Sequence, residues 1–177
     1  MSEERAAGPC PVERVHRSSL PSRPTARFTA ANSSSISDGA SALVIADEQA
    51  LNGAAPLARI VGHATHSQHP SEFTLAPVGV IGKLLGELGW QADDVDLFEI
   101  NEAFAMVTML AIQELKLDAE RVNVYGGACA QGHPIGSTGS RLLVTLAHAM
   151  AARKLKRGIA ALCIGGGEAT AVALERD

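Results

Sequence analysis

From Phe28 onward, the sequence alternates short β-rich apolar runs with longer segments whose hydrophobic residues recur at helical spacing. The expected strands are 57–62, 95–100, 122–125, 158–164 and 170–174, and the expected helices are about 77–88, 102–115 and 137–153. Alternation of this kind favours right-handed crossovers and parallel pairing. We therefore predict an α/β fold with helices packed on a mostly parallel five-stranded sheet of βαβαβαββ order, ending in an antiparallel pair.

The two segments before this pattern differ from it. Residues 1–27 hold four of the eight prolines and little periodic hydrophobicity, a composition that does not offset the entropy of ordering a chain. We expect a disordered polar tail there, a leader or misplaced translation start, with a basic targeting segment as the alternative. Residues 38–46 form an apolar element outside the repeat, which looks like a piece of another sheet.

Charge and composition argue against several classes of partner. The chain has 15 Lys and Arg against 19 Asp and Glu, a net charge of -4, so it lacks a large positive field for nucleic acid or an anionic membrane. Aromatic residues are 3% of the chain, which leaves little for base stacking. No apolar run reaches the roughly 18 to 20 residues that span a bilayer, and the three cysteines form no CxxC pair. We expect a soluble, cytoplasmic protein that binds neither nucleic acid nor membrane.

Three reactive side chains follow the ends of expected strands. Asn101 follows the second strand, His133 lies in the turn after the third, and Cys163 ends the fourth beside three glycines. Because parallel strands bring their carboxyl ends to one edge of a sheet, we expect these side chains to converge there. An amide, an imidazole, a thiol and glycine backbone amides can serve as a base, an acid or nucleophile, and an oxyanion cradle.

Each of these residues also has an ordinary structural interpretation. Free cysteine is often a small buried core residue, asparagine often caps a helix, and a lone turn histidine is usually satisfied locally. The three glycines after Cys163 favour the functional interpretation, because they are poor strand material and suit a backbone that approaches a ligand or another chain.

Other motifs do not fit competing functions. Residues 132–139 lack the GxG pair of a dinucleotide site, and neither GxxxxGK[ST] nor GxSxG occurs. His63, His66 and His69 are evenly spaced, but they lie in an expected loop without an accompanying cysteine, so solvated or pocket-lining histidines are the default. We expect no metal site and no resident cofactor.

Three longer motifs occur in order: NEAFA at 101–105, GGACAQGHPIG at 126–136 and CIGGG at 163–167. Together they resemble the thiolase family, specifically its acetyl-CoA acetyltransferase type. With residues 29–39, the similarity covers about 28–177 and only the second half of a full thiolase. On this resemblance, 28–55 is a remnant of the N-terminal thiolase half and 56–177 is the C-terminal domain.

The resemblance implies a role for each site residue. His133 would activate a nucleophilic cysteine that takes up the acyl group, and Cys163 would exchange a proton with the α-carbon of a second acetyl-CoA. Asn101 would hold a water that forms one oxyanion hole with His133, and the Gly165 backbone amide would contribute to the other. The resemblance also implies two residues that bind substrate, an acyl-pocket residue and a residue of the loop that contacts coenzyme A: Phe104 and Ser34.

The sequence departs from the family at the nucleophile. The family's nucleophilic cysteine lies in a segment resembling N-x-V-C-x-S-G, which does not occur here, and Cys10 lies between two prolines without matching it. Most of the loop domain that binds coenzyme A is also missing. We therefore expect the isolated chain to lack the acyl-transfer half-reaction.

A thiolase half would leave one sheet face or helix layer uncovered, and an exposed apolar patch marks a missing partner. We predict that the chain homo-oligomerises, pairs with a separately encoded N-terminal half, or is a poorly soluble fragment. The leading hypothesis is an acetyl-CoA C-acetyltransferase half, active in Claisen condensation or thiolytic cleavage of acetoacetyl-CoA when completed by a partner. The alternatives are a non-catalytic CoA-binding or assembly protein and an inactive gene fragment.

Overall fold

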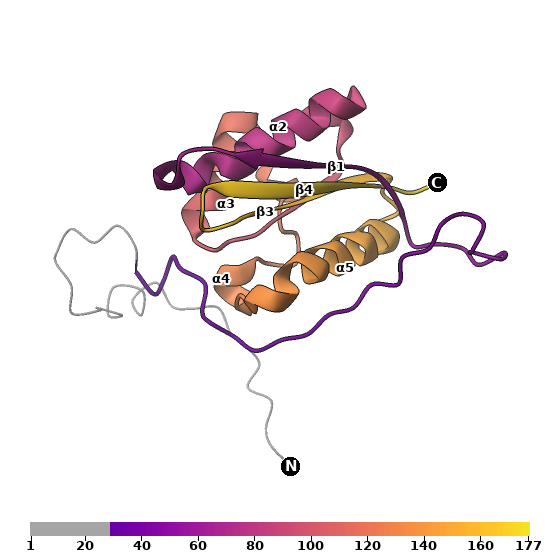
Figure 1. Ribbon diagram of the computed structural model, residues 1–177, viewed down its shortest axis with the longest axis horizontal. Helices are drawn as coiled ribbons and strands as arrows, with labels where there is room; N and C mark the ends of the chain where they lie inside the picture. Colours follow the sequence, from indigo (N-terminus) through magenta and orange to yellow (C-terminus); the bar gives the residue numbers. More distant parts are fainter. Residues whose placement is uncertain (1–28) are drawn as a thin grey trace, which may run out of the picture.

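The computed structural model describes residues 29–177, so the predicted tail 1–27, with Cys10, lies outside the described residues. One sheet lies between two helical layers, α2 and α3 on one face and α4 and α5 on the other (Figure 1). In chain order the elements are β1 (Arg59–Ser67), η1 (Pro70–Leu75), α2 (Ala76–Leu88), η2 (Ala92–Asp94), β2 (Leu97–Ile100), α3 (Ala105–Leu115), η3 (Ala119–Arg121), α4 (Ala128–Gln131), α5 (Ile135–Arg153), β3 (Arg157–Cys163) and β4 (Glu168–Glu175).

The sheet of the described residues has four strands in the order β1-β4-β3-β2. Only β2 and β3 are parallel, with Leu97 opposite Gly158 and Ile100 opposite Ala161. Strand β4 is antiparallel to both of its neighbours, β1 and β3. The α/β class is confirmed, but the prediction of five mostly parallel strands is wrong, because the sheet is mixed and mostly antiparallel.

The expected third strand, 122–125, does not form, and the Asn123 side chain pairs with β2 in its place. Val122 makes a single parallel bridge to Phe98, and Asn123 then takes a left-handed φ of 49° that turns the backbone away from the sheet. The Asn123 side chain continues the pairing: its Oδ1 accepts from the Ile100 N–H at 2.8 Å and its Nδ2 donates to the Ile100 carbonyl at 2.9 Å. The Asn123 amide therefore bonds the N–H and the carbonyl of Ile100, which a fifth strand would otherwise pair with.

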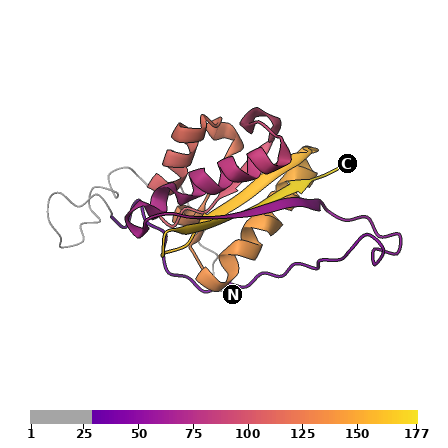
Figure 2. The ribbon, with the colours of Figure 1, turned by 45° about the horizontal axis from the view of Figure 1, so that its top comes forward.

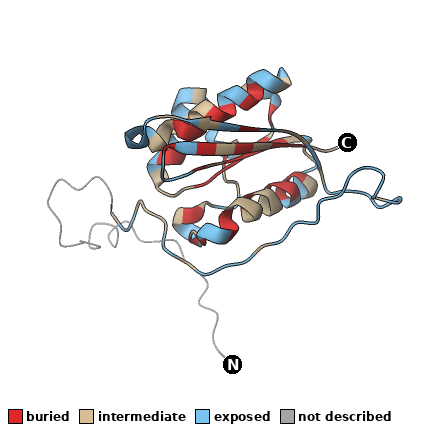
Figure 3. Ribbon diagram, in the orientation of Figure 1, coloured by how far each residue is buried: buried red, intermediate tan, exposed pale blue. Residues whose placement is uncertain are grey.

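Two apolar clusters hold the layers together, and buried residues concentrate where the helices face the sheet (Figure 3). Strand alternation sends Phe98 and Ile100 toward α2 and α3, whereas Leu97 packs with Leu146 and Met150 of α5. Burial on both faces explains the near-continuous apolar sequence of the two parallel strands. Helices thus cover both faces of the sheet.

Residues ahead of β1 do not join the sheet. The apolar stretch 38–46, expected to be a piece of another sheet, has no regular structure. Residues 33–46, called the extended segment below, run past α5 (Figure 2), and Val44 and Ile45 are 100% and 72% exposed. No helix within residues 29–177 is both long and apolar enough to cross a membrane.

Candidate active site

Asn101 lies at the carboxyl end of β2. Its backbone N–H donates to the Ala161 carbonyl at 2.9 Å, which extends the β2–β3 ladder by one residue and fixes the start of the side chain. The residue is 1% exposed, and its Nδ2 lies 3.4 Å from Nε2 of His133. The structure therefore brings together two of the three predicted site residues.

His133 is held in place by contacts on both of its ring nitrogens and on its backbone. Its backbone N–H donates to the Ser35 carbonyl at 3.0 Å, so the segment before β1 pairs with the histidine turn. Its Nδ1 lies 2.6 Å from Oγ1 of Thr138, in the first turn of α5. The imidazole consequently turns Nε2 toward Asn101.

Gly132 makes the close approach at this turn possible. Its φ is 87°, and a side-chain carbon there would collide with the Ser37 hydroxyl. Both conditions favour glycine. On the other side, Nη1 of Arg141 donates to the Gly132 carbonyl at 2.9 Å. The turn before His133 is therefore fixed from α5 and from the extended segment.

The surroundings of His133 favour its neutral form. Burial lowers the pKa of the His133 imidazole, and the positive charge of Arg141 lowers this pKa further. A neutral imidazole at physiological pH can accept a proton, which a general base must do.

Cys163 ends β3 at the same edge of the sheet. It pairs with Ala169 of β4 and lies two residues beyond Ala161, whose carbonyl binds the Asn101 amide. Burial raises the pKa of its thiol, so the thiol keeps its proton at neutral pH. Among residues 29–177 it makes no hydrogen bond to Asn101 or His133, and the convergence of all three groups stays a prediction.

Gly165 lies in the turn that joins β3 to β4. This turn is closed by the Ile164 N–H, which donates to the Glu168 carbonyl at 2.7 Å, and by the Gly167 N–H, which donates to the Ile164 carbonyl at 3.1 Å. Gly165 itself is exposed. Its backbone is accessible to a ligand, and its oxyanion role stays a prediction.

Ser34 and Phe104, the two expected substrate contacts, lie together at the loop after Asn101. The backbone N–H and hydroxyl of Ser34 donate to the Ala103 carbonyl at 3.2 and 3.1 Å. The Phe104 ring packs edge-on against Phe73 at a centroid distance of 6.0 Å. The extended segment thus borders the same loop that presents Asn101.

Comparison with known proteins identifies the family of this chain. The family model described as the thiolase C-terminal domain matches residues 54–176. The chain belongs to the thiolase family. The family resemblance inferred from the three motifs is thereby confirmed.

The alignments with individual relatives include most of this chain but less than half of the length of each relative. A probable acetyl-CoA acetyltransferase of Dictyostelium discoideum is 47% identical over 155 residues, 86% of this chain and 37% of the relative. The acetyl-CoA acetyltransferase of Escherichia coli strain K12 is 49% identical over 150 residues, 84% of this chain and 38% of the relative. Human mitochondrial 3-ketoacyl-CoA thiolase, solved in complex with CoA, is similar with a TM-score of 0.92 and 37% identity, covering 98% of this chain and 45% of that chain.

In this thiolase domain, Glu102 is a structural residue that the sequence analysis missed. Its carboxylate accepts from the Cys129 backbone N–H at 3.0 Å and from Asn123 Nδ2 at 3.3 Å. It therefore ties the loop after β2 to α4. Burial first, and the Glu102 charge second, raise the pKa of the Cys129 thiol to about 11. Cys129 is therefore protonated and unreactive at neutral pH.

Thr138, Arg141 and Asn123 were also missed, because all three lie outside the three motifs. One signal was available in the sequence: the hydroxyl of Thr138 comes five residues after His133, at the expected start of a helix. A polar side chain in a first helical turn can reach back to the turn before it.

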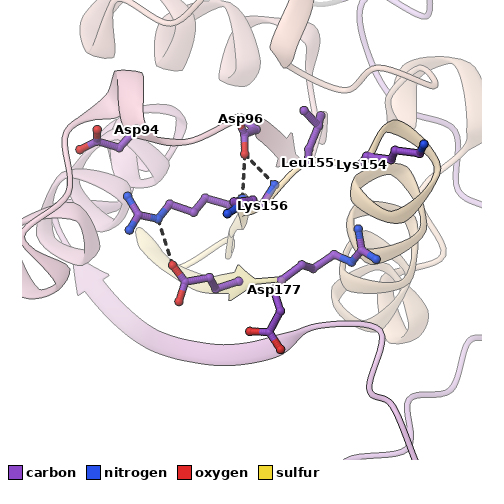
Figure 4. Close-up of a pocket in the computed structure, with 9 residues that line it drawn as sticks. Asp94, Asp96, Lys154, Leu155, Lys156 and Asp177 are labelled. Atoms are coloured by element: carbon purple, nitrogen blue, oxygen red, sulfur yellow. Dashed lines mark hydrogen bonds and ion pairs between the residues drawn. The ribbon is translucent and has the colours of Figure 1, made fainter.

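A cleft among the described residues lies at the opposite edge of the thiolase sheet. It is lined by residues before β2, at the start of β3 and at the end of β4: Asp94, Asp96, Lys154, Leu155, Lys156, Arg157, Glu175, Arg176 and Asp177 (Figure 4). Its charges are largely used within the protein, since Asp96 binds the backbone N–H groups of Lys156 and Arg157, and Arg157 pairs with Glu175 at 3.1 Å. We therefore place the candidate site at the edge where β2 and β3 end, beside Asn101, His133 and Cys163. Within the same described residues, no three His, Cys, Asp or Glu side chains gather to hold a metal ion.

Proposed function

We propose that the chain supplies the histidine, asparagine and proton-exchanging cysteine of an acetyl-CoA acetyltransferase, acting on acetyl-CoA and acetoacetyl-CoA. The observation that carries the proposal is the buried Asn101 amide facing Nε2 of His133 at 3.4 Å. The relatives named acetyl-CoA acetyltransferase and the similar structure with CoA bound support the substrate class.

In the cleavage direction, the proposed reaction starts at a nucleophilic cysteine on a partner polypeptide. Nε2 of His133 takes the proton of that thiol, and the sulfur bonds to the ketone carbon of acetoacetyl-CoA. The carbon–carbon bond then breaks, and its electron pair goes to the α-carbon of the departing acetyl-CoA. Cys163 gives this carbon a proton. Asn101 with His133, through a water, stabilises one oxygen that becomes negatively charged, and the Gly165 amide stabilises the other. The thiol of free CoA then attacks the acetyl group and gives its proton to the Cys163 thiolate, and the released sulfur of the nucleophile takes its proton back from His133.

The acid–base properties of the two groups suit these roles. The lowered pKa keeps His133 neutral, so it can accept the nucleophile's proton. The raised pKa keeps the Cys163 thiol protonated, so it can donate to carbon in cleavage. In condensation the same sulfur, once deprotonated, is a strong base for the α-carbon.

The nucleophile is proposed to come from a separate N-terminal thiolase half. Residues 1–177 contain no N-x-V-C-x-S-G segment, so copies of this sequence alone would not supply the nucleophile. The exposed apolar side chains of the extended segment, Leu43, Val44 and Ile45, support a protein partner. Self-association through this segment is a second way to cover it.

Co-expression with the N-terminal half of the Escherichia coli relative tests the proposal. Acetoacetyl-CoA cleavage is measured on the purified complex. We expect turnover with the wild type and its loss with Cys163→Ala or His133→Ala. Cys129→Ala is the matched control, because Cys129 lies outside the reacting groups, and it should retain activity.

If the halves co-purify but the wild type shows no turnover, the catalytic proposal is wrong. Saturable CoA binding by calorimetry would then favour the non-catalytic CoA-binding or assembly protein. A chain that neither binds CoA nor recruits the other half would favour an inactive fragment. The cytoplasmic location also stays a prediction, and cell fractionation with an antibody to the chain tests it.

A further inference from the structure

The Thr138 hydroxyl lies between a ring nitrogen and a carbonyl oxygen. Its Oγ1 is 2.6 Å from Nδ1 of His133 and 3.0 Å from the carbonyl oxygen of Pro134. Thr138 is 1% exposed, so water has little access to these contacts. The hydroxyl is the only group of the three whose hydrogen can be directed either way.

Proton counting links these contacts to the state of the histidine. A hydroxyl has a single proton to donate, and a carbonyl oxygen can only accept. If Thr138 donates to Pro134, it must accept from an Nδ1–H of His133. Nε2 then carries a lone pair, toward which the Asn101 Nδ2 donates at 3.4 Å.

We propose that Thr138 is a positioning residue, which holds His133 in the tautomer with its proton on Nδ1 and leaves Nε2 free to take up a proton. The catalytic meaning of this tautomer rests on the proposed function. The tautomer itself does not, because it follows from contacts within the chain.

The opposite tautomer, with the His133 proton on Nε2, is chemically possible and would use a different set of hydrogen bonds. Thr138 would donate to Nδ1, and an Nε2–H would donate to Oδ1 of Asn101 after a rotation of that amide. This arrangement would give a partner to Asn101 Oδ1, a buried atom that has none among the described residues. It would, however, leave the 3.0 Å contact between Thr138 and Pro134 unused. The proposed arrangement uses all three short contacts around the ring and its threonine.

The tautomer is measurable on the full chain by long-range proton–nitrogen NMR correlation after labelling with ¹⁵N-histidine. The His133 signals are identified among the six histidines as those absent from His133→Asn. Above the pKa of the ring, we expect the wild type to show a protonated Nδ1 and an unprotonated Nε2. Thr138→Ser should keep this pattern, because it keeps the hydroxyl.

Thr138→Val keeps the shape of the side chain but removes the acceptor. We expect its His133 to change to a mixture or to the Nε2–H tautomer, with Asn101 Oδ1 as the new acceptor. A wild-type spectrum with Nε2 protonated would overturn the proposal, and so would a folded Thr138→Val with unchanged signals. If Thr138→Val does not fold, the wild-type spectrum alone decides.

Activity gives a second readout in the reconstituted complex. Thr138→Val should lower kcat by at least about tenfold, a loss of general-base efficiency, whereas Thr138→Ser should stay within about threefold. The KM should change little, since the hydrogen bonds of Thr138 go to His133 and to Pro134 of the same turn. If the NMR result holds and no complex turns over, the proposed function fails and the tautomer assignment stands. If turnover is present but the wild-type tautomer is Nε2–H, the assignment fails and the function stands.

Discussion

The side-chain amide of Asn101 and the imidazole of His133 meet at 3.4 Å, although 32 residues separate them in the sequence. The amide is placed by the sheet, through its backbone bond to Ala161. The imidazole is placed by Ser35 and by Thr138. Three independent parts of the chain therefore define one pair, and each can be tested separately.

Asn101→Ala should lower the kcat of the reconstituted complex by about 100- to 1,000-fold, the usual cost of losing one donor to a developing oxyanion. The KM for acetoacetyl-CoA should change by less than about threefold, because the donor acts mainly in the transition state. Steady-state cleavage kinetics measure both. Asn52→Gly is a suitable control, since Asn52 is exposed and glycine tolerates its left-handed φ of 46°. An unchanged kcat for Asn101→Ala would remove Asn101 from the mechanism.

Glu99 should make the domain less stable as pH rises. Burial raises its pKa from 4.5 to about 7, Arg141 opposes this rise, and Glu102 adds to it. The folded state thus binds a proton that the unfolded state has lost, so stability is full below pH 4.5 and falls as pH rises through 7. The fall is at most about 3 kcal/mol.

Urea unfolding of the wild type and of Glu99→Gln at pH 5 and pH 8 tests this prediction. The neutral amide should abolish most of the pH-dependent fall in the free energy of unfolding. Glu87→Gln, on the exposed side of α2, should leave that fall intact. Equal pH dependence in the wild type and Glu99→Gln would show that Glu99 is not the group responsible.

Two glycines should respond in opposite directions to alanine. At Gly158, in β3, a side-chain carbon would lie 2.6 Å from Met150 Sδ and 2.8 Å from Leu146 Cδ1. Both neighbours are fully buried, so Gly158→Ala should destabilise by about 1 to 3 kcal/mol. At Gly82, an exposed position of α2, nothing lies within 4 Å, so Gly82→Ala should stabilise by up to about 1 kcal/mol. Denaturant unfolding at one pH measures both, and a shared sign would contradict the packing argument.

Elements with strong local signals could be predicted from the sequence. The pattern of apolar residues located the strand before Asn101, and the proline and glycine around α2 marked its ends, with Gly89 in the left-handed cap. The strand 122–125 could not be predicted correctly, because Val122-Asn-Val-Tyr is apolar enough for a strand. The left-handed turn at Asn123 and the bonds from its side chain to Ile100 prevent this apolar run from forming a strand.

The antiparallel final pair, β3 with β4, was predicted correctly, but the direction of β1 was misjudged for a related reason. Alternating helices and strands favour parallel pairing, but β1 and β4, the first and last strands within residues 29–177, pair antiparallel beside β3. Local periodicity carries no information on which strands become neighbours. For the site, the motifs located Asn101 and His133. Thr138, which holds the ring from a different element, could be recognised only once α5 was placed against the turn.

The extended segment should make the isolated chain self-associate or bind a hydrophobic dye. Ile36, Val44 and Ile45 are 97%, 100% and 72% exposed, and large apolar side chains exposed in this way favour association. We expect anilinonaphthalene sulfonate fluorescence and a sedimentation profile heavier than a monomer. Val44→Glu should reduce both signals, and co-expression with an N-terminal thiolase half should suppress them. Met109→Glu is the matched control, because Met109 is 66% exposed on α3, away from the segment. A monodisperse wild-type monomer that binds no dye would show that this segment needs no partner.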